Sequence, residues 1–94
     1  MTAFDKMAAK IVKEQALVIG PLAWIEAAKV QGLVADRGSD HIEITGPDQS
    51  QAIDRLVAQY ERLFGRASHE VCREAAANII AELPAGDVPV SLRS

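Results

Sequence analysis

Hydrophobic residues recur every three or four positions over the first part of the chain, and charged residues fill the positions between them. Residues 3–19 follow this 3.6-residue rhythm, which is typical of an amphipathic helix. Thr2 precedes the segment and is expected to be its N-cap, because a threonine hydroxyl can accept a hydrogen bond from a free N–H of the first turn. The apolar stripe comprises Phe4, Met7, Ala8, Ile11, Val12 and Val18.

A glycine-proline pair interrupts the most apolar stretch of the chain, residues 16–25. Gly20 is expected to supply the turn that ends the first helix. Pro21 is expected at the first position of a second helix, where its missing N–H is no loss. We interpret Gly20 and Pro21 as a structural hinge. The second helix should run to about Gln31 and end at Gly32. It is apolar around nearly its whole circumference, which predicts that other helices or a second copy of the chain surround it.

Polar and apolar residues alternate over residues 41–45, which predicts a short, half-buried strand. A strand needs a pairing partner, and the segment with a similar alternation is residues 87–92. Pro89 would restrict that second strand to an edge of the sheet. Residues 35–40 are expected to form a loop. The two-stranded ribbon would pair either within one chain or between two chains.

Two further amphipathic helices are expected in the second half of the chain. Asp48 is the predicted N-cap of the third helix, and Gly65 is predicted to end it. Ser68 is the predicted N-cap of the fourth helix, which Pro84 would stop. The sequence therefore predicts a mainly α fold, a compact bundle of about four helices with an accessory β-ribbon.

Size and composition agree with one domain over residues 1–94, with residues 84–94 as a tail that the ribbon would order. Hydrophobic residues make up 49% of the chain and aromatic residues only 4%, so aliphatic side chains must build the core. The net charge is −3, and the second helix is too apolar to read a DNA groove. We expect no nucleic-acid partner.

Cys72 is the only cysteine, which excludes a disulfide within the chain and favours a reducing, cytoplasmic location. Lys6, Lys10 and Lys13 before residues 16–25 resemble a signal peptide, but the helical pattern begins too early for one. The apolar run is too short to span a membrane, so no membrane partner is expected.

One compact group of reactive side chains stands out, His69, Glu70 and Cys72. On a helix His69 and Cys72 would share a face, as a nucleophile and its base or two metal ligands would. Zinc needs three or four ligands, and His41 is the only other histidine. The pattern favours a core cysteine beside a surface histidine, so we predict no enzyme activity, no metal and no cofactor.

Three arginines recur along the third helix and its end, Arg55, Arg62 and Arg66. They would form a stripe that binds an acidic partner peptide or a phosphate, or else a face that is simply solvated. Trp24 and Tyr60 would either pack in the core or line an apolar pocket. The second alternative would make the protein a small-ligand carrier or sensor.

The stretch from Ile19 to Ala23, Ile-Gly-Pro-Leu-Ala, resembles a small bacterial domain of uncharacterised function. The signature of that domain is Ile-Gly-Pro, an aliphatic residue and Ala at a helix junction. The resemblance implies an all-helical module without known catalysis, often appended to signalling proteins.

These observations lead to one expectation for function. The chain is predicted to be a non-catalytic protein-interaction module in bacterial signalling or regulation, acting as a homodimer with a protein partner. The predicted dimer contacts are Trp24, Ile25, Ile42 and Ile44. The alternative is the small-ligand carrier or sensor described above.

Overall fold

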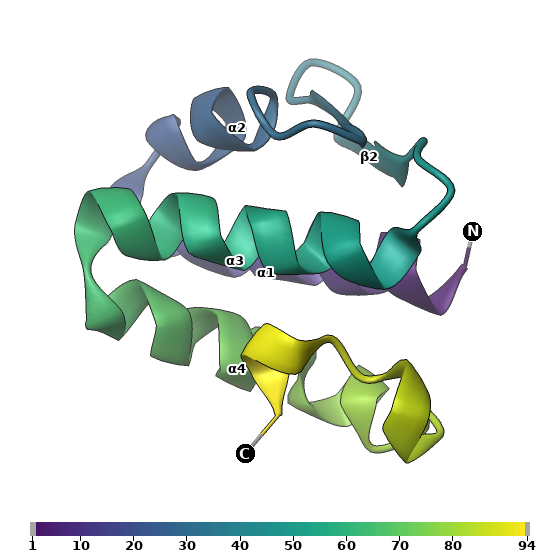
Figure 1. Cartoon of the computed structure of the whole chain (residues 1–94). Coiled ribbons are helices and arrows are strands. Elements are labelled where there is room, and N and C mark those ends of the chain that lie inside the picture. The colour runs from purple at the N-terminus through teal and green to yellow at the C-terminus, as the bar shows by residue number, and fades with distance from the viewer. Residues whose placement is uncertain (1, 94) are drawn as a thin grey trace.

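A computed structural model describes residues 2–93 of the chain. Over these residues the chain forms four α-helices and a two-stranded hairpin, in the order α1 (Ala3–Ile19), α2 (Leu22–Ala27), β1 (Leu33–Asp36), β2 (His41–Ile44), α3 (Gln49–Phe64) and α4 (Arg66–Ile80). Two 3₁₀ turns follow, η1 (Ala85–Asp87) and η2 (Val90–Leu92). Figure 1 shows α1 and α3 side by side in a middle layer, with α2 and the hairpin above them and α4 below. The predicted mainly α fold is confirmed.

Helix α1 begins with a reciprocal pair of hydrogen bonds. The Thr2 hydroxyl accepts from the Asp5 N–H at 3.1 Å, and the Asp5 carboxylate accepts from the Thr2 N–H at 3.2 Å, so the predicted N-cap is confirmed. Asp5 also accepts from the N–H of Ile44 at 2.9 Å, which fastens the hairpin to the start of α1. Burial raises the pKa of Asp5, but the hydrogen bonds from Ile44 and Thr2 outweigh it and hold the pKa below its ordinary value.

The junction between α1 and α2 depends on one residue in a left-handed conformation. Gly20 has a φ of +69°, and its N–H closes α1 by bonding to the Ala16 carbonyl at 3.0 Å. A side chain is strained at this φ, which explains glycine at this position. Pro21 is the N-cap of α2, one position earlier than expected, and its carbonyl accepts from the N–H of Trp24.

Helix α2 is shorter than the sequence predicts, because it ends at Ala27 rather than near Gln31. The backbone tightens after Ala27 into turns in which Val30 donates to the Ala27 carbonyl. Gly32, at a φ of +87°, then redirects the chain into β1.

The hairpin corrects the predicted ribbon. The strand predicted at residues 41–45 is present as β2, but its partner is β1, with Leu33 opposite Ile44 and Ala35 opposite Ile42. Residues 87–92 do not form the predicted strand. The chain there turns locally, because Pro89 donates no N–H and its carbonyl accepts from Leu92 at 3.0 Å. The segment 35–40 was expected to be loop throughout, yet its first two residues belong to β1.

Helices α3 and α4 form an antiparallel pair joined at Gly65. Asp48 caps α3 by accepting from the Gln51 N–H at 3.0 Å, as predicted, and Gly65 ends it at a φ of +86°. The prediction that Ser68 caps α4 is wrong: Gly65 is the N-cap, α4 begins at Arg66, and Ser68 lies buried within the first turn.

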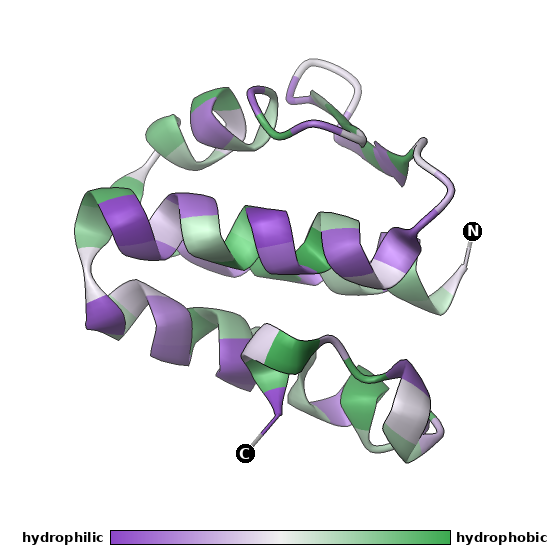
Figure 2. Cartoon of the chain, in the orientation of Figure 1, coloured by the Kyte–Doolittle hydropathy of each residue, from purple (hydrophilic) through white to green (hydrophobic). Residues whose placement is uncertain are grey.

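Aliphatic side chains from all layers meet in one core. Figure 2 shows hydrophobic and hydrophilic residues alternating along the helices, as expected when each helix buries one side. The largest fully buried hydrophobic side chains are Tyr60, Met7, Ile11, Ile42, Ile53 and Leu56. The C-terminal segment joins this core, since Val88, Pro89 and Leu92 are buried too.

Candidate functional site

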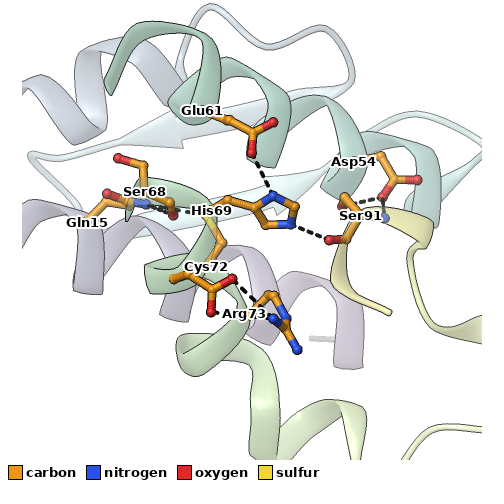
Figure 3. A network of polar contacts seen from close by, with 9 residues as sticks. Gln15, Asp54, Glu61, Ser68, His69, Cys72, Arg73 and Ser91 are labelled. Carbon is orange, nitrogen blue, oxygen red and sulfur yellow. Dashed lines mark hydrogen bonds and ion pairs between the residues drawn. The ribbon is translucent and has the colours of Figure 1, made fainter. Parts of the chain in front are cut away.

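The three predicted reactive side chains of α4, His69, Glu70 and Cys72, lie in different surroundings in the structure. His69 lies between α3 and the C-terminal segment, where its Nδ1 is 2.7 Å from Glu61 Oε2 and its Nε2 is 2.5 Å from the Ser91 carbonyl oxygen (Figure 3). Both partners are acceptors, so both ring nitrogens must carry a proton to satisfy them. The hydrogen bond to Ser91 is the main cause that raises the pKa of His69 above its ordinary value; burial opposes it, and Glu61 adds to it.

The network continues beyond His69 to α3. The N–H and the hydroxyl of Ser91 both donate to Asp54 Oδ1, at 2.9 Å and 2.5 Å. Glu61 and Asp54, both on α3, thus hold η2 through His69 and Ser91 (Figure 3). The network therefore attaches the C-terminal segment to α3 and α4.

Cys72 is turned into the core rather than towards His69. Its side chain is fully buried, and its sulfur accepts from Gln15 Nε2 at 3.3 Å. The same amide donates to the Ser68 carbonyl at 2.8 Å, which fastens α1 to the first turn of α4. Burial raises the pKa of the Cys72 thiol to about 11. Because the thiolate is the nucleophile, a thiol with this pKa is poorly suited to covalent catalysis. Glu70, the third member of the group, pairs with Arg73 at 3.1 Å.

The two aromatic residues expected either in the core or in a pocket lining belong to the core cluster. Trp24 and Tyr60 are both buried, and the Tyr60 hydroxyl donates to the Ala23 carbonyl at 2.6 Å. Burial raises the pKa of Tyr60 well above its ordinary value. This contact joins α3 to α2. The burial of both aromatic side chains favours the alternative in which they pack in the core.

Three of the four predicted dimer contacts lie inside the chain. Trp24, Ile42 and Ile44 are buried in the core and offer little surface to a second copy in this conformation. Ile25 points outward and is 51% exposed. Alternation and apolar periodicity show that a side chain is buried, but not whether its own chain or another chain buries it.

Among the described residues, the two most exposed large apolar side chains are not predicted dimer contacts. Leu17 is 81% exposed and Val18 is 67% exposed, in the last turn of α1. With Val71 and Ala75 of α4 they line a groove of about 450 Å³, which we call the α1–α4 groove. Its rim carries the charged residues Lys10, Glu14 and Glu74. The exposure of Leu17 was predictable from the sequence. Leu17 lies four residues after Lys13 and three after Glu14, so it shares the polar side of the helix with them.

The predicted arginine surface is only partly assembled. Arg55 and Arg62 share a groove between α3 and the turn after α2, but Arg66 begins α4 and does not line that groove. Lys29 takes its place as the third cation. This neighbour was hidden in the sequence, because Lys29 is 26 residues before Arg55 and only the turn after α2 brings them together.

Within residues 2–93, no three side chains among His, Cys, Asp and Glu gather closely enough to hold a metal ion. Across the same part of the chain, none of the helices has the length and apolar character needed to cross a membrane.

Comparison of the chain with models of protein families, with curated proteins and with solved structures gave no match. The resemblance at Ile19–Ala23 therefore stays a prediction, and function has to be argued from the surfaces just described.

Proposed function

We propose that the chain is a non-catalytic protein-interaction module that forms a homodimer through the α1–α4 groove. One observation carries this proposal, the exposure of Leu17 and Val18 side by side on a regular helix. Each such side chain gains about 1.5–3 kcal/mol when it is fully removed from water. Adjacent apolar residues that stay in water on an ordered helix are therefore a typical mark of a binding surface.

The charges on the rim support a second copy as the occupant. Lys10 and Glu14 pair at 3.3 Å along α1, and Glu74 faces the same groove from α4. In a two-fold symmetric interface, the same patch meets itself and every contact occurs twice. A rim with both signs of charge can place Lys10 of one copy against an acidic residue of the other.

The biological setting of the proposal rests on the sequence. The resemblance of Ile19–Ala23 to a bacterial helical domain supports a role in signalling or regulation. The single, buried thiol of Cys72 fits a reducing, cytoplasmic location.

Polar substitution in the groove tests the proposal. Sedimentation velocity over a concentration series gives the dimer dissociation constant of the unaltered chain, of Leu17→Gln and of Val18→Gln. Each substitution removes an apolar contact twice per dimer, about 3 kcal/mol or more in total, so each should weaken association about 100-fold or more. Val34→Gln is the matched control, because Val34 is also an exposed valine but lies on β1.

Two results would contradict the proposal. A chain that sediments as a 10.1 kDa monomer at every concentration does not self-associate. Equal weakening by Val34→Gln and Leu17→Gln would show association through non-specific apolar contact. A monomer that binds a different protein through Leu17 would keep the interaction role and remove the homodimer.

A further inference from the structure

A groove of about 470 Å³ lies between α3 and the turn that follows α2, on a different pair of elements from the α1–α4 groove. Figure 1 shows the two segments that line it, α3 and the turn after α2, in neighbouring layers. Three of its lining residues are cations and two are small or apolar. We call it the cationic groove; the residues that matter here are Lys29, Val30, Arg55, Ala58, Gln59 and Arg62.

Neutral groups hold both guanidinium groups in place. Arg55 Nη2 donates to Gln51 Oε1 at 2.9 Å, and Arg62 Nη2 donates to Gln59 Oε1 at 2.7 Å. A second Arg55 nitrogen lies 3.5 Å from the Gln31 carbonyl oxygen. Amide oxygens orient a guanidinium without neutralising it, so both positive charges remain available to an anion.

One carboxylate stands against the three cations. Lys29 Nζ pairs with Glu26 Oε2 at 3.1 Å, and the other oxygen of Glu26 accepts from Gln59 Nε2 at 2.8 Å. Glu26 also attracts Arg62 electrostatically, but one carboxylate cannot balance the charges of Lys29, Arg55 and Arg62 together. The surplus of positive charge is local, since the whole chain carries a net charge of −3.

The spacing of the two arginines limits what can bind both. Arg55 and Arg62 are seven residues apart on α3, which is about 10.5 Å along the axis of a helix. A polyproline II segment repeats every three residues and rises about 3.1 Å per residue, so side chains three apart lie about 9 Å apart on one face. Ala58 lies between the arginines and Val30 borders the groove, which leaves room for a small apolar residue between two carboxylates.

We propose that the cationic groove binds an extended acidic segment of a partner protein, with carboxylates three residues apart that pair with Arg55 and Arg62. Each carboxylate would accept hydrogen bonds from one guanidinium, and Lys29 would add long-range attraction. The proposal deepens the proposed function, because it gives the chemistry of a partner for an interaction module.

Other anions fit the groove less well. A single phosphate is too small to reach two guanidinium groups that are separated by two helical turns. A nucleic acid is recognised through a broad basic surface, whereas this groove has three cations on a chain of net negative charge. Asp48 lines the adjoining hollow beyond Arg55, where it would repel a longer polyanion.

The test measures binding of a fluorescent Glu-Pro-Ala repeat peptide by anisotropy. Arg55→Gln and Arg62→Gln should each weaken binding about three- to fivefold, as expected for exposed ion pairs, and the double variant should weaken it about tenfold or more. Arg66→Gln is the matched control, since it removes the same charge from an exposed arginine outside the groove. It should change binding by less than about twofold.

Further arms of the same experiment would overturn the proposal. Equal weakening by Arg66→Gln and Arg62→Gln would mean non-specific charge attraction. Equal binding of a peptide that has its glutamates side by side would remove the spacing argument. Tighter binding of a DNA duplex, with loss in the same variants, would identify a nucleic-acid site, and full competition by inorganic phosphate would identify a simple anion site. No binding of the repeat peptide would also overturn the proposal.

The outcome of the peptide-binding test can be distinguished from the outcome of the dimerisation test. The peptide carries no surface for the α1–α4 groove, and Leu17→Gln leaves the cationic groove intact. If Leu17→Gln is monomeric and still binds the peptide, both proposals stand. Loss of peptide binding with normal dimerisation removes only the acidic-partner proposal.

Discussion

The imidazole of His69 lies 2.5 Å from the carbonyl oxygen of Ser91, across 22 residues of sequence. This contact replaces the predicted strand at residues 87–92 as the means by which the C-terminal segment is held. It is a side-chain contact to a local turn, and it depends on the protonation state of one histidine.

Protonation of His69 should make stability depend on pH. The folded state raises its pKa above the ordinary value of 6.5, so its contribution is complete below about pH 6.5 and is lost as the pH rises through the folded-state pKa. Urea unfolding should therefore show a free energy of unfolding that falls as the pH rises above about 6.5. His69→Gln should flatten this dependence.

His41→Gln is the control for that measurement, because His41 is exposed in the hairpin, where its Nε2 lies 3.3 Å from the exposed Glu43. It should leave the slope above about pH 6.5 unchanged. A slope that survives in His69→Gln would show that another group is responsible.

Gly20→Ala should lower the free energy of unfolding by about 1–2 kcal/mol, the cost of a side chain in the left-handed region. The effect would come from the backbone alone, because a β-carbon at Gly20 would meet no atom within 4 Å. Gly86→Ala is matched, since its site is equally open and its φ is not positive. We expect a change within about 0.5 kcal/mol for it in denaturant titrations. Equal effects of the two substitutions would mean that the corner at Gly20 needs no special conformation.

Cys72 should react slowly with a thiol reagent in the native protein. Its burial and its pKa of about 11 keep the thiolate scarce at neutral pH. Alkylation should be about 100-fold or more slower in buffer than in urea. Similar rates in both conditions would show that the sulfur is accessible, and would reopen a catalytic role for Cys72 and His69.

Local signals in the sequence account for most of the helical part of the fold. Thr2 and Asp48 supply a cap, and Gly20 and Gly65 supply a left-handed φ, so the corresponding helix ends follow from nearest neighbours. Ser68 misled the prediction because its hydroxyl suits a cap, whereas Gly65 had already provided the turn.

Parts of the fold that depend on distant contacts were not predictable in the same way. In strand β1, Leu33 and Ala35 lie opposite Ile44 and Ile42 of β2. The strand directly follows Gly32, the expected end of the second helix, so its short sequence resembles a loop. The second 3₁₀ turn of the tail, η2, packs on α3 and α4 and buries Leu92, a contact that only the folded chain can show.

For the candidate surfaces, too, neighbours on one helix were predictable and neighbours brought together by the fold were not. Arg55 and Arg62 were predictable as neighbours because both lie on one helix, seven residues apart. Lys29 joins them through the turn after α2, and no spacing in the sequence indicates that contact. Trp24 and Ile42 belong to an apolar pattern that looks the same whether their own chain or another chain buries them.

Intermolecular paramagnetic broadening tests the proposed homodimer most directly. A nitroxide attached through Asn78→Cys would sit on α4 one turn after Glu74, beside the α1–α4 groove and outside its lining residues, and the buried Cys72 would stay unlabelled at neutral pH. This chain is mixed with isotope-labelled chain that carries no nitroxide. The account predicts that amide resonances of Val18, Val71 and Ala75 broaden in the isotope-labelled copy. Broadening confined to the hairpin, or none at concentrations where the chain self-associates, would contradict it.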